Sequence, residues 1–104
     1  MAAYMINKNN FQEEVLQERG TVVIDFFAPW CMPCKKMSPV VDKIAQEYEG
    51  SVKVGKVNIE EEPELAKEFG VMSIPTLIVM KEGKVQKRSV GLKTKKEVEK
   101  MILI

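Results

Sequence analysis

Two cysteines separated by two residues are the side chains in this sequence best suited to chemistry. They are the only cysteines among the 104 residues and lie in the segment Trp30-Cys31-Met32-Pro33-Cys34. Residues three positions apart on a helical turn share one face, so a small rotamer adjustment brings the two sulfurs to bonding distance. Pro33 lacks an N–H and presets φ for such a first turn. The spacing therefore predicts a pair that alternates between a dithiol and a disulfide.

The pair is expected to lie where a strand ends and a long helix begins. Residues 22–28 form a nearly continuous apolar run, typical of a strand that is covered on both faces. After the cysteines, apolar residues recur at helical spacing as far as Gly50, with a kink expected at Pro39. Backbone N–H groups at the start of that helix favour negative charge and stabilise a thiolate. We therefore expect Cys31 to be the exposed attacking thiol and Cys34 to resolve the mixed disulfide.

Three other uses of the cysteine pair compete with this interpretation. A structural disulfide in so short a loop adds only about 2 kcal/mol, and a reducing compartment disfavours it. A closed metal site needs four ligands, whereas this chain offers two thiols and no histidine, so only a site shared between chains would form. Inert buried thiols are common, but the flanking Trp30 and Pro33 favour exposure. We therefore expect no metal and no bound cofactor, only the redox-active disulfide of Cys31 and Cys34.

A carboxylate and an ammonium are placed to assist the cysteines. Asp25 lies within the apolar run, where an unpaired carboxylate has a raised pKa and exchanges protons near neutral pH. In the alternating strand that follows, Lys56 falls on the same face as Val52 and Val54, so its ammonium is directed inward, toward Asp25. We predict that Asp25, assisted by Lys56, is the general base for Cys34. The competing interpretation is a satisfied buried acid beside a lysine whose stem packs on the sheet.

Composition and charge argue against several classes of protein. A chain of 104 residues, 45% of them hydrophobic, has the size of one domain, so we expect a single domain over residues 1–104. Charged residues make up 30% of the chain but nearly cancel at +1, which argues against nucleic acid or an anionic membrane as a partner. Residues 1–10 lack the pattern of a signal peptide, and no apolar run approaches the ~20 residues of a membrane span. The expected location is the cytoplasm.

The remaining pattern alternates between extended and helical segments. It predicts an α/β protein of the order β-α-β-α-β-α-β-β-α, with a central mixed sheet of about five strands and about four helices on its two faces, in three layers. Capping boxes are expected from Asn10 with Glu13 before the first helix and from Thr94 with Glu97 before the last. The face of the first helix that should be buried consists of Phe11, Val15 and Leu16. The predicted strands cover residues 4–6, 22–28, 52–59, 76–80 and 85–90.

Taken together, these residues resemble the thioredoxin family over nearly the whole chain. The segments that carry the resemblance, in the family's order and spacing, are Val23-Ile24-Asp25-Phe26-Phe27-Ala28-Pro29-Trp30-Cys31, Lys36-Met37-Ser38-Pro39, Lys56-Val57-Asn58, Ser73-Ile74-Pro75-Thr76-Leu77, Gly83 and Gly91. The resemblance implies the thioredoxin fold and the activity of a protein-disulfide reductase. It implies Cys31 as nucleophile, Cys34 as resolving thiol and Asp25 as the buried acid. It also implies a cis bond at Pro75, which general base rates leave undecided.

The resemblance further implies a shallow apolar groove in which partner proteins dock. Its residues in this sequence are Trp30, Met32, Pro33, Ile74, Pro75, Gly91 and Leu92. The implied partners are proteins that carry disulfides and a thioredoxin reductase, which returns the pair to the dithiol. The protein is expected to act as a monomer.

Two positions depart from the family's pattern. Met32 stands where the usual motif has glycine, and Phe27 stands where many members have a second tryptophan. The residues between the cysteines tune the redox potential, so a flexible thioether there alters partner fit and the balance between disulfide and dithiol. A neutral exchange is the competing interpretation, because both thiols and the proline remain.

The leading hypothesis is a general dithiol reductant of cytosolic proteins. One alternative is an oxidase or isomerase that makes or shuffles disulfides, which a reducing compartment disfavours. Another is an interaction module with idle thiols, which the intact segment 30–34 together with Asp25 disfavours. Glutathione chemistry of the glutaredoxin kind fits the context of the cysteines less well.

Overall fold

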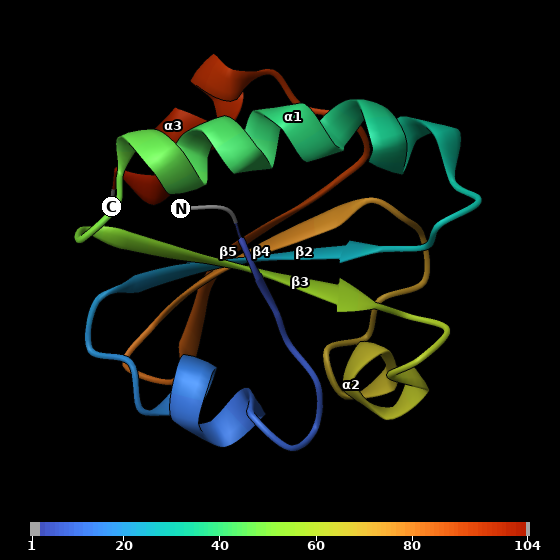
Figure 1. Cartoon of the computed structure of the whole chain (residues 1–104), viewed down its shortest axis with the longest axis horizontal. Coiled ribbons are helices and arrows are strands. Elements are labelled where there is room, and N and C mark those ends of the chain that lie inside the picture. The colour runs from blue at the N-terminus through green and yellow to red at the C-terminus, as the bar shows by residue number, and fades with distance from the viewer. Residues whose placement is uncertain (1–2, 104) are drawn as a thin grey trace.

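A five-stranded mixed sheet forms the centre of the protein, as the computed structural model of residues 3–103 shows (Figure 1). The elements, in chain order, are β1 (Tyr4–Met5), η1 (Gln12–Leu16), β2 (Thr21–Phe27), α1 (Met32–Glu47), β3 (Val52–Asn58), α2 (Pro63–Glu68), β4 (Thr76–Lys81), β5 (Lys84–Val90) and α3 (Lys95–Ile102). The strands lie in the order β1-β3-β2-β4-β5. β1 and β2 pair with β3 in parallel, whereas β4 runs antiparallel to β2 and to β5. The predicted mixed sheet is confirmed.

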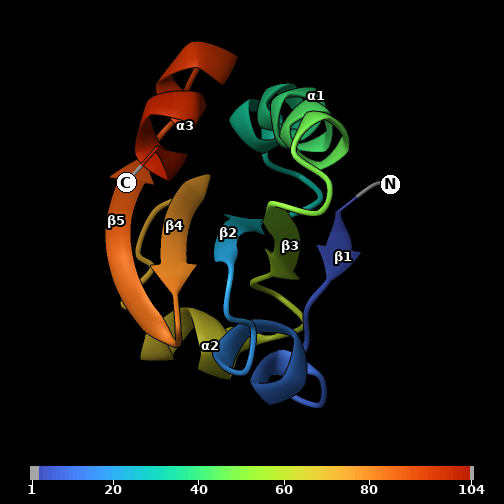
Figure 2. The same ribbon diagram turned by 90° about the vertical axis from the view of Figure 1, so that its left-hand side faces the viewer.

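Different helices cover the two faces of the sheet. α1 and α3 lie on one face, and η1 and α2 lie on the other (Figures 1 and 2). Because the side chains of a strand point alternately to the two faces, β2 contributes to both layers. Val23 is buried in one cluster with Met37 and Val98, whereas Ile24 is buried in a second cluster with Leu65. The prediction that residues 22–28 form a strand covered on both faces is confirmed.

Most of the other predicted elements are also confirmed. The last two strands form the expected antiparallel hairpin, with Glu82 and Gly83 at positive φ in its turn. α3 begins at the expected capping box, in which the Glu97 N–H donates to Thr94 Oγ1 at 3.2 Å and the Thr94 N–H donates to Glu97 Oε1 at 2.9 Å. α1 continues through Pro39, as the helical spacing predicted.

The first helix differs from the prediction. It is a π-helix without a side-chain cap. Asn10 forms no capping box with Glu13, because its side-chain oxygen accepts the Asn7 N–H at 2.9 Å instead. Val15 is buried as expected, but Leu16 is 41% exposed. A turn closed by i→i+5 hydrogen bonds spaces its buried positions differently from an α-helical turn, which moves Leu16 off the buried face.

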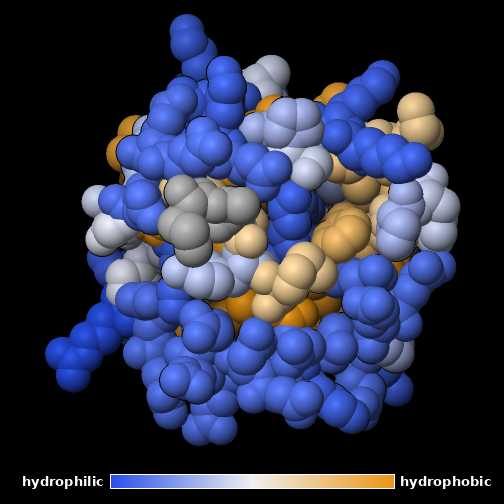
Figure 3. All heavy atoms as spheres, viewed as in Figure 1, coloured by the Kyte–Doolittle hydropathy of each residue, from blue (hydrophilic) through white to orange (hydrophobic). Residues whose placement is uncertain are grey.

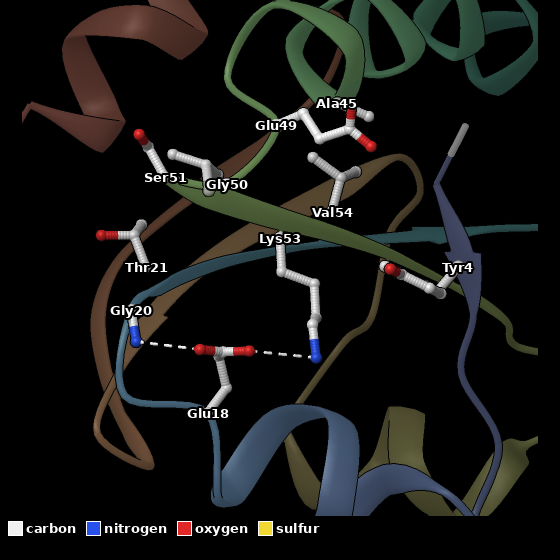
Figure 4. Close-up of a pocket in the computed structure, with 11 residues that line it drawn as sticks. Tyr4, Glu18, Gly20, Thr21, Ala45, Glu49, Gly50, Ser51, Lys53 and Val54 are labelled. Carbon is white, nitrogen blue, oxygen red and sulfur yellow. Dashed lines mark hydrogen bonds and ion pairs between the residues drawn. The ribbon is translucent and has the colours of Figure 1, made fainter. Parts of the chain in front are cut away.

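Ion pairs link the segment around η1 to β3. Lys53 Nζ lies 2.9 Å from Glu14 Oε1 and 3.0 Å from Glu18 Oε1. Figure 4 shows the Lys53 side chain pointing toward Glu18, which also accepts the Gly20 N–H. That backbone hydrogen bond, together with Lys53, holds the pKa of Glu18 below its ordinary value. All of these side chains are partly exposed, so each pair contributes only about 0 to 1 kcal/mol and serves mainly to orient η1.

The view in Figure 3 shows a largely hydrophilic face. Its apolar side chains gather in a band between α1 above and the layer of η1 and α2 below. None of the helices in residues 3–103 is long and apolar enough to cross a membrane.

β1 approaches β3 closely at Gly55. A Cβ atom at this position would lie 2.6 Å from Ile6 Cγ1, and Ile6 is itself 2% exposed. Gly55→Ala is therefore expected to lower the free energy of unfolding by about 1 to 3 kcal/mol, because the buried isoleucine has no free space into which to move. Urea unfolding measures the loss.

Gly20→Ala is the matched control for that substitution. A Cβ atom at Gly20 would lie 3.6 Å from its nearest neighbours, which is an ordinary van der Waals distance. We expect its stability to stay within about 0.5 kcal/mol of the parent protein. Equal losses in the two variants would show that the close approach of Ile6 is not the cause.

Candidate active site

Cys31 and Cys34 form a disulfide at the start of α1. β2 ends at Phe27, and after a short connection Cys31 takes the N-cap position of α1 in an extended conformation. The two Cα atoms are 5.2 Å apart. Pro33 lies in the first turn, where a backbone N–H has no helical partner. The predicted succession of strand, cysteine pair and helix is confirmed.

The helix end directs partial positive charge at the cysteine sulfurs. The Cys34 N–H donates to Cys31 Sγ at 3.2 Å, in the manner of a capping hydrogen bond. In the dithiol state the same N–H group and the helix dipole favour a thiolate on Cys31, by about 0.3 to 1 kcal/mol for the dipole. The helix end therefore favours negative charge on the sulfur of the first cysteine.

The prediction that Cys31 is exposed is wrong for the disulfide state. Cys31 is 5% exposed and Cys34 is 3% exposed. Cys34 is one of the buried residues of α1, and the disulfide joins Cys31 to it. The residues packed around the two cysteines are Ala28, Phe27, Ile59 and Ile74. A partner must therefore reach a sulfur that has little accessible surface.

The loop before β4 lies directly beside the disulfide. The Ile74–Pro75 peptide bond is cis, as the family resemblance implied. The carbonyl oxygen of Ile74 lies 3.9 Å from Cys31 Sγ. The carbonyl oxygen of Pro75 accepts the Gly91 N–H at 2.8 Å. These contacts bring two segments that are distant in sequence next to the cysteines.

The residues expected to form a docking groove differ in exposure. Trp30 is 64% exposed, Met32 is 60% exposed and Leu92 is 47% exposed. Pro33 is also exposed, Ile74 and Gly91 are half-buried, and Pro75 is buried. The apolar surface around the disulfide is therefore formed mainly by the large side chains that flank it.

Two groups near this surface were missed from the sequence. Glu60 Oε2 accepts the indole N–H of Trp30 at 2.6 Å and so restricts the ring. Met72 is 94% exposed and stands two residues before Ile74 in the sequence. The position of Met72 next to the segment 73–77 was a usable signal. Nothing in the spacing of Glu60 indicated its contact with the tryptophan.

Asp25 lies inside the layer that α1 covers. It shares this face of β2 with Val23 and is 1% exposed, and its Oδ1 atom has no hydrogen-bond partner. Burial raises the pKa of Asp25 to about 7, the charge of Lys56 opposes this change, and the charge of Asp42 adds to it. The carboxyl can therefore take up and release a proton near neutral pH.

Lys56 is directed inward, as predicted, but its ammonium binds to α1. Lys56 is paired with Asp25 in the register of β2 and β3. Its Nζ atom donates to Ser38 Oγ at 2.7 Å and lies 3.3 Å from Asp42 Oδ1. Ser38 and Asp42 were missed from the sequence, although a spacing of four residues puts them on one face of a helix. The predicted contact between Lys56 and Asp25 is thus replaced by these two contacts.

A cavity of about 140 Å³ connects these groups with the second cysteine. Its lining residues are Asp25, Phe27, Ala28, Pro29, Cys34, Lys35, Ser38 and Lys56. The cavity is shared by the Asp25 carboxyl and the Cys34 sulfur, and a bridging water between two such groups can relay a proton. The arrangement places a carboxyl with a raised pKa beside the second cysteine.

A second hollow, of about 220 Å³, lies at the other end of β2, beside Thr21 (Figure 4). The length of the strand separates it from the cysteines, and the charge of Lys53 within it is compensated by Glu14 and Glu18. It offers no group to the disulfide. Residues 3–103 contain no cluster of three or more cysteine, aspartate or glutamate side chains that could hold a metal ion.

A family model and several known proteins are similar to this chain, and they all point to the same family. The family model named Thioredoxin matches residues 2–103. Thioredoxin 1 of Nostoc sp. is 50% identical over 82 residues, which cover 79% of this chain and 77% of the relative. Thioredoxin of Porphyra purpurea is 42% identical over 99 residues, covering 95% and 92% of the two chains. Thioredoxin of Pseudomonas aeruginosa is 38% identical over 100 residues, covering 94% and 93%.

The family model matches nearly the whole chain, and the structure adds a disulfide between the two cysteines of the Cys-x-x-Cys motif. A disulfide of this kind takes up two electrons and two protons to become a dithiol, and the reverse reaction restores it. The protein is therefore a thiol–disulfide oxidoreductase and belongs to the thioredoxin family.

Proposed function

We propose that the protein reduces disulfides of other proteins, with Cys31 as the attacking thiolate and Cys34 as the resolving thiol. The observation that carries the proposal is the position of their disulfide at the N-terminus of α1, next to the cavity that contains Asp25. The helix end favours the thiolate on the first cysteine. The cavity supplies a proton acceptor to the second.

The proposed reaction transfers two electrons in two steps. The Cys31 thiolate attacks one sulfur of the substrate disulfide, which forms a mixed disulfide and releases the other substrate sulfur as a thiolate. Cys34 then loses its proton and attacks Cys31 Sγ, so the intramolecular disulfide forms and the second substrate sulfur leaves. The substrate ends as a dithiol, and the cysteine pair ends oxidised.

Asp25 is the proposed general base of the second step. Its carboxyl faces the cavity that Cys34 also lines, and its pKa of about 7 matches the range in which a base works best at neutral pH. Lys56, which lines the same cavity, is proposed to assist Asp25 through its positive charge without direct contact with the carboxyl. In the disulfide state that ammonium is bound to Ser38 and Asp42.

The exposed side chains around the disulfide are the proposed docking surface. Trp30, Met32 and Leu92 offer apolar area, and the loop that contains Ile74 and Pro75 lies against Cys31 Sγ. Backbone groups of such a loop are suited to hold an extended substrate segment.

We also propose the setting in which the activity is used. The chain acts as one domain and as a monomer in the cytoplasm, and a thioredoxin reductase returns its disulfide to the dithiol. The low net charge of +1 and the absence of other cysteines in the sequence are consistent with such a carrier.

Cys34→Ser tests the assignment of the two cysteines. Without the resolving thiol, Cys31 is expected to remain joined to its substrates, so reducing-agent-sensitive complexes accumulate and mass spectrometry identifies the trapped cysteines. Cys31→Ser is the matched control and should trap little, because Cys34 lies deeper and lacks the N-cap position. Stronger trapping by the control would reverse the assignment.

Asp25→Ala tests the proposed base. The variant is expected to slow the resolution of the mixed disulfide by about 100-fold or more at pH 7, the effect of a lost proton acceptor, and to change the first attack much less. Trp30 is the only tryptophan and stands next to Cys31, so its fluorescence can follow both steps in a stopped-flow instrument. Equal slowing of the two steps would remove Asp25 from the mechanism.

The raised pKa of Asp25 also predicts how stability depends on pH. Between pH 4 and pH 7 the folded protein binds this proton more tightly than the unfolded chain, so stability is full at the acid end and falls as pH rises toward 7. The change from 3.8 to about 7 corresponds to at most roughly 4 kcal/mol.

Asp25→Asn is expected to remove this slope and to be more stable than the parent protein at pH 8. Urea unfolding of the disulfide form at pH 5 and at pH 8 measures the effect. Parallel stability curves for the two proteins would contradict the assignment of the slope to Asp25.

A further inference from the structure

The ammonium of Lys56 does not form the ion pair with Asp25 that the register of the strands favours. Lys56 and Asp25 are direct partners in the register of β2 and β3, and both line the same cavity. An unpartnered carboxyl oxygen on one strand and an ammonium on the next would normally form a salt bridge. Here Asp25 Oδ1 stays without a hydrogen-bond partner, and Lys56 Nζ binds to α1.

Two side chains one helical turn apart hold the ammonium there. Lys56 Nζ donates to Ser38 Oγ at 2.7 Å and lies 3.3 Å from Asp42 Oδ1. Ser38 also lines the cavity, whereas the side chain of Asp42 is 41% exposed. A serine hydroxyl and a carboxylate, four residues apart on one face of α1, thus satisfy a lysine that is only 16% exposed.

The location of this ammonium controls how well Asp25 accepts a proton. An ammonium in direct contact with the carboxylate would stabilise its charged form and make it a weaker base. An ammonium held by α1 acts from a greater distance, and the negative charge of Asp42 offsets part of it. The strength of Asp25 as a base matters for the second step of the proposed reaction, in which Asp25 takes up the proton of Cys34.

We propose that Ser38 and Asp42 are positioning residues that keep the Lys56 ammonium on α1 and off the Asp25 carboxyl, so that Asp25 remains an effective base for Cys34. This inference rests on the proposed function of Asp25. Neither residue touches the substrate or the reacting sulfurs. Both act through Lys56, and Asp42 also acts through its own charge.

The groups that face Asp25 come from few elements. β4 places the apolar Leu77 opposite it. α3 packs on this face through Val98 and Ile102, while its Lys95 and Glu99 bind Glu47 and Tyr48 instead. The titratable or charged groups that remain are Cys34, Lys35 and Asp42 on α1 and Lys56 on β3.

Ser38→Ala separates positioning from charge, because it removes a hydroxyl without changing any charge. With one of its two partners lost, the ammonium is expected to move toward the carboxylate, and the pKa of Asp25 should fall by about 0.5 to 1 pH unit. Titration of the side-chain carboxyl carbon of Asp25 by NMR, in the disulfide form, measures this directly. Ser38→Thr keeps a hydroxyl and should restore the parent value.

A double-variant comparison shows whether the effect passes through the lysine. In a Lys56→Gln background, Ser38→Ala should no longer change the titration of Asp25, whereas Asp42→Asn should still lower the pKa through the loss of its own negative charge. Glu64→Gln, an exposed acidic residue on α2, is the matched control and should leave the titration unchanged. An Asp25 pKa that stays constant or rises in Ser38→Ala, or a fall that persists with Lys56→Gln, would overturn the proposal.

The rate of resolution provides a second readout that a purely structural role would not move. In Ser38→Ala the lower limb of the pH profile for resolution should shift to lower pH together with the NMR titration, and its plateau rate should fall about 2- to 5-fold because the base is weaker. If the titration shifts while the pH profile does not, Asp25 is not the base and the positioning effect alone stands. If the titration does not shift, the positioning inference fails whatever the rates show.

Discussion

Burial of β2 on both faces is the constraint on which the rest of the structure depends. Val22, Val23, Ile24 and Phe26 are each at most 1% exposed, so the strand cannot shift by one residue without moving its core side chains to the wrong layer. The end of this strand determines where the chain turns into α1, and the cysteine pair is placed at that turn. Because side chains point alternately to the two faces of a strand, Asp25 lies with Val23 in the layer beneath α1.

A carboxyl group in such a strand is unfavourable for folding and useful for chemistry. Its charged form is poorly solvated, and the charges of Lys56 and Asp42 act on its pKa in opposite directions. A hydrophobic residue would satisfy the packing of β2 better. A local departure from the rules of burial, placed beside a reactive cysteine, is typical of a functional site.

Sequence patterns predicted those features that depend on neighbours along the chain. The alternation of β2 and β3 correctly placed Asp25 and Lys56 on one face, and the capping box at Thr94 was correct. The capping box at Asn10 was wrong because a nearby asparagine competed for its side chain. The burial of Cys31 and the partners of Lys56 depend on which side chains of α1 reach the sheet. Spacing alone does not specify those distances.

Met32 changes the outer surface of the site and leaves its interior unaltered. Its side chain is 60% exposed, and among residues 3–103 it is not one of those that line the cavity of Asp25. The Cys34 N–H still reaches Cys31 Sγ, and Pro33 still lies in the first turn of α1. The cavity beside Cys34 and the hydrogen bond at the helix end therefore do not involve the thioether. On the proposed docking surface, a flexible and polarisable side chain at that position would act on the fit of substrates.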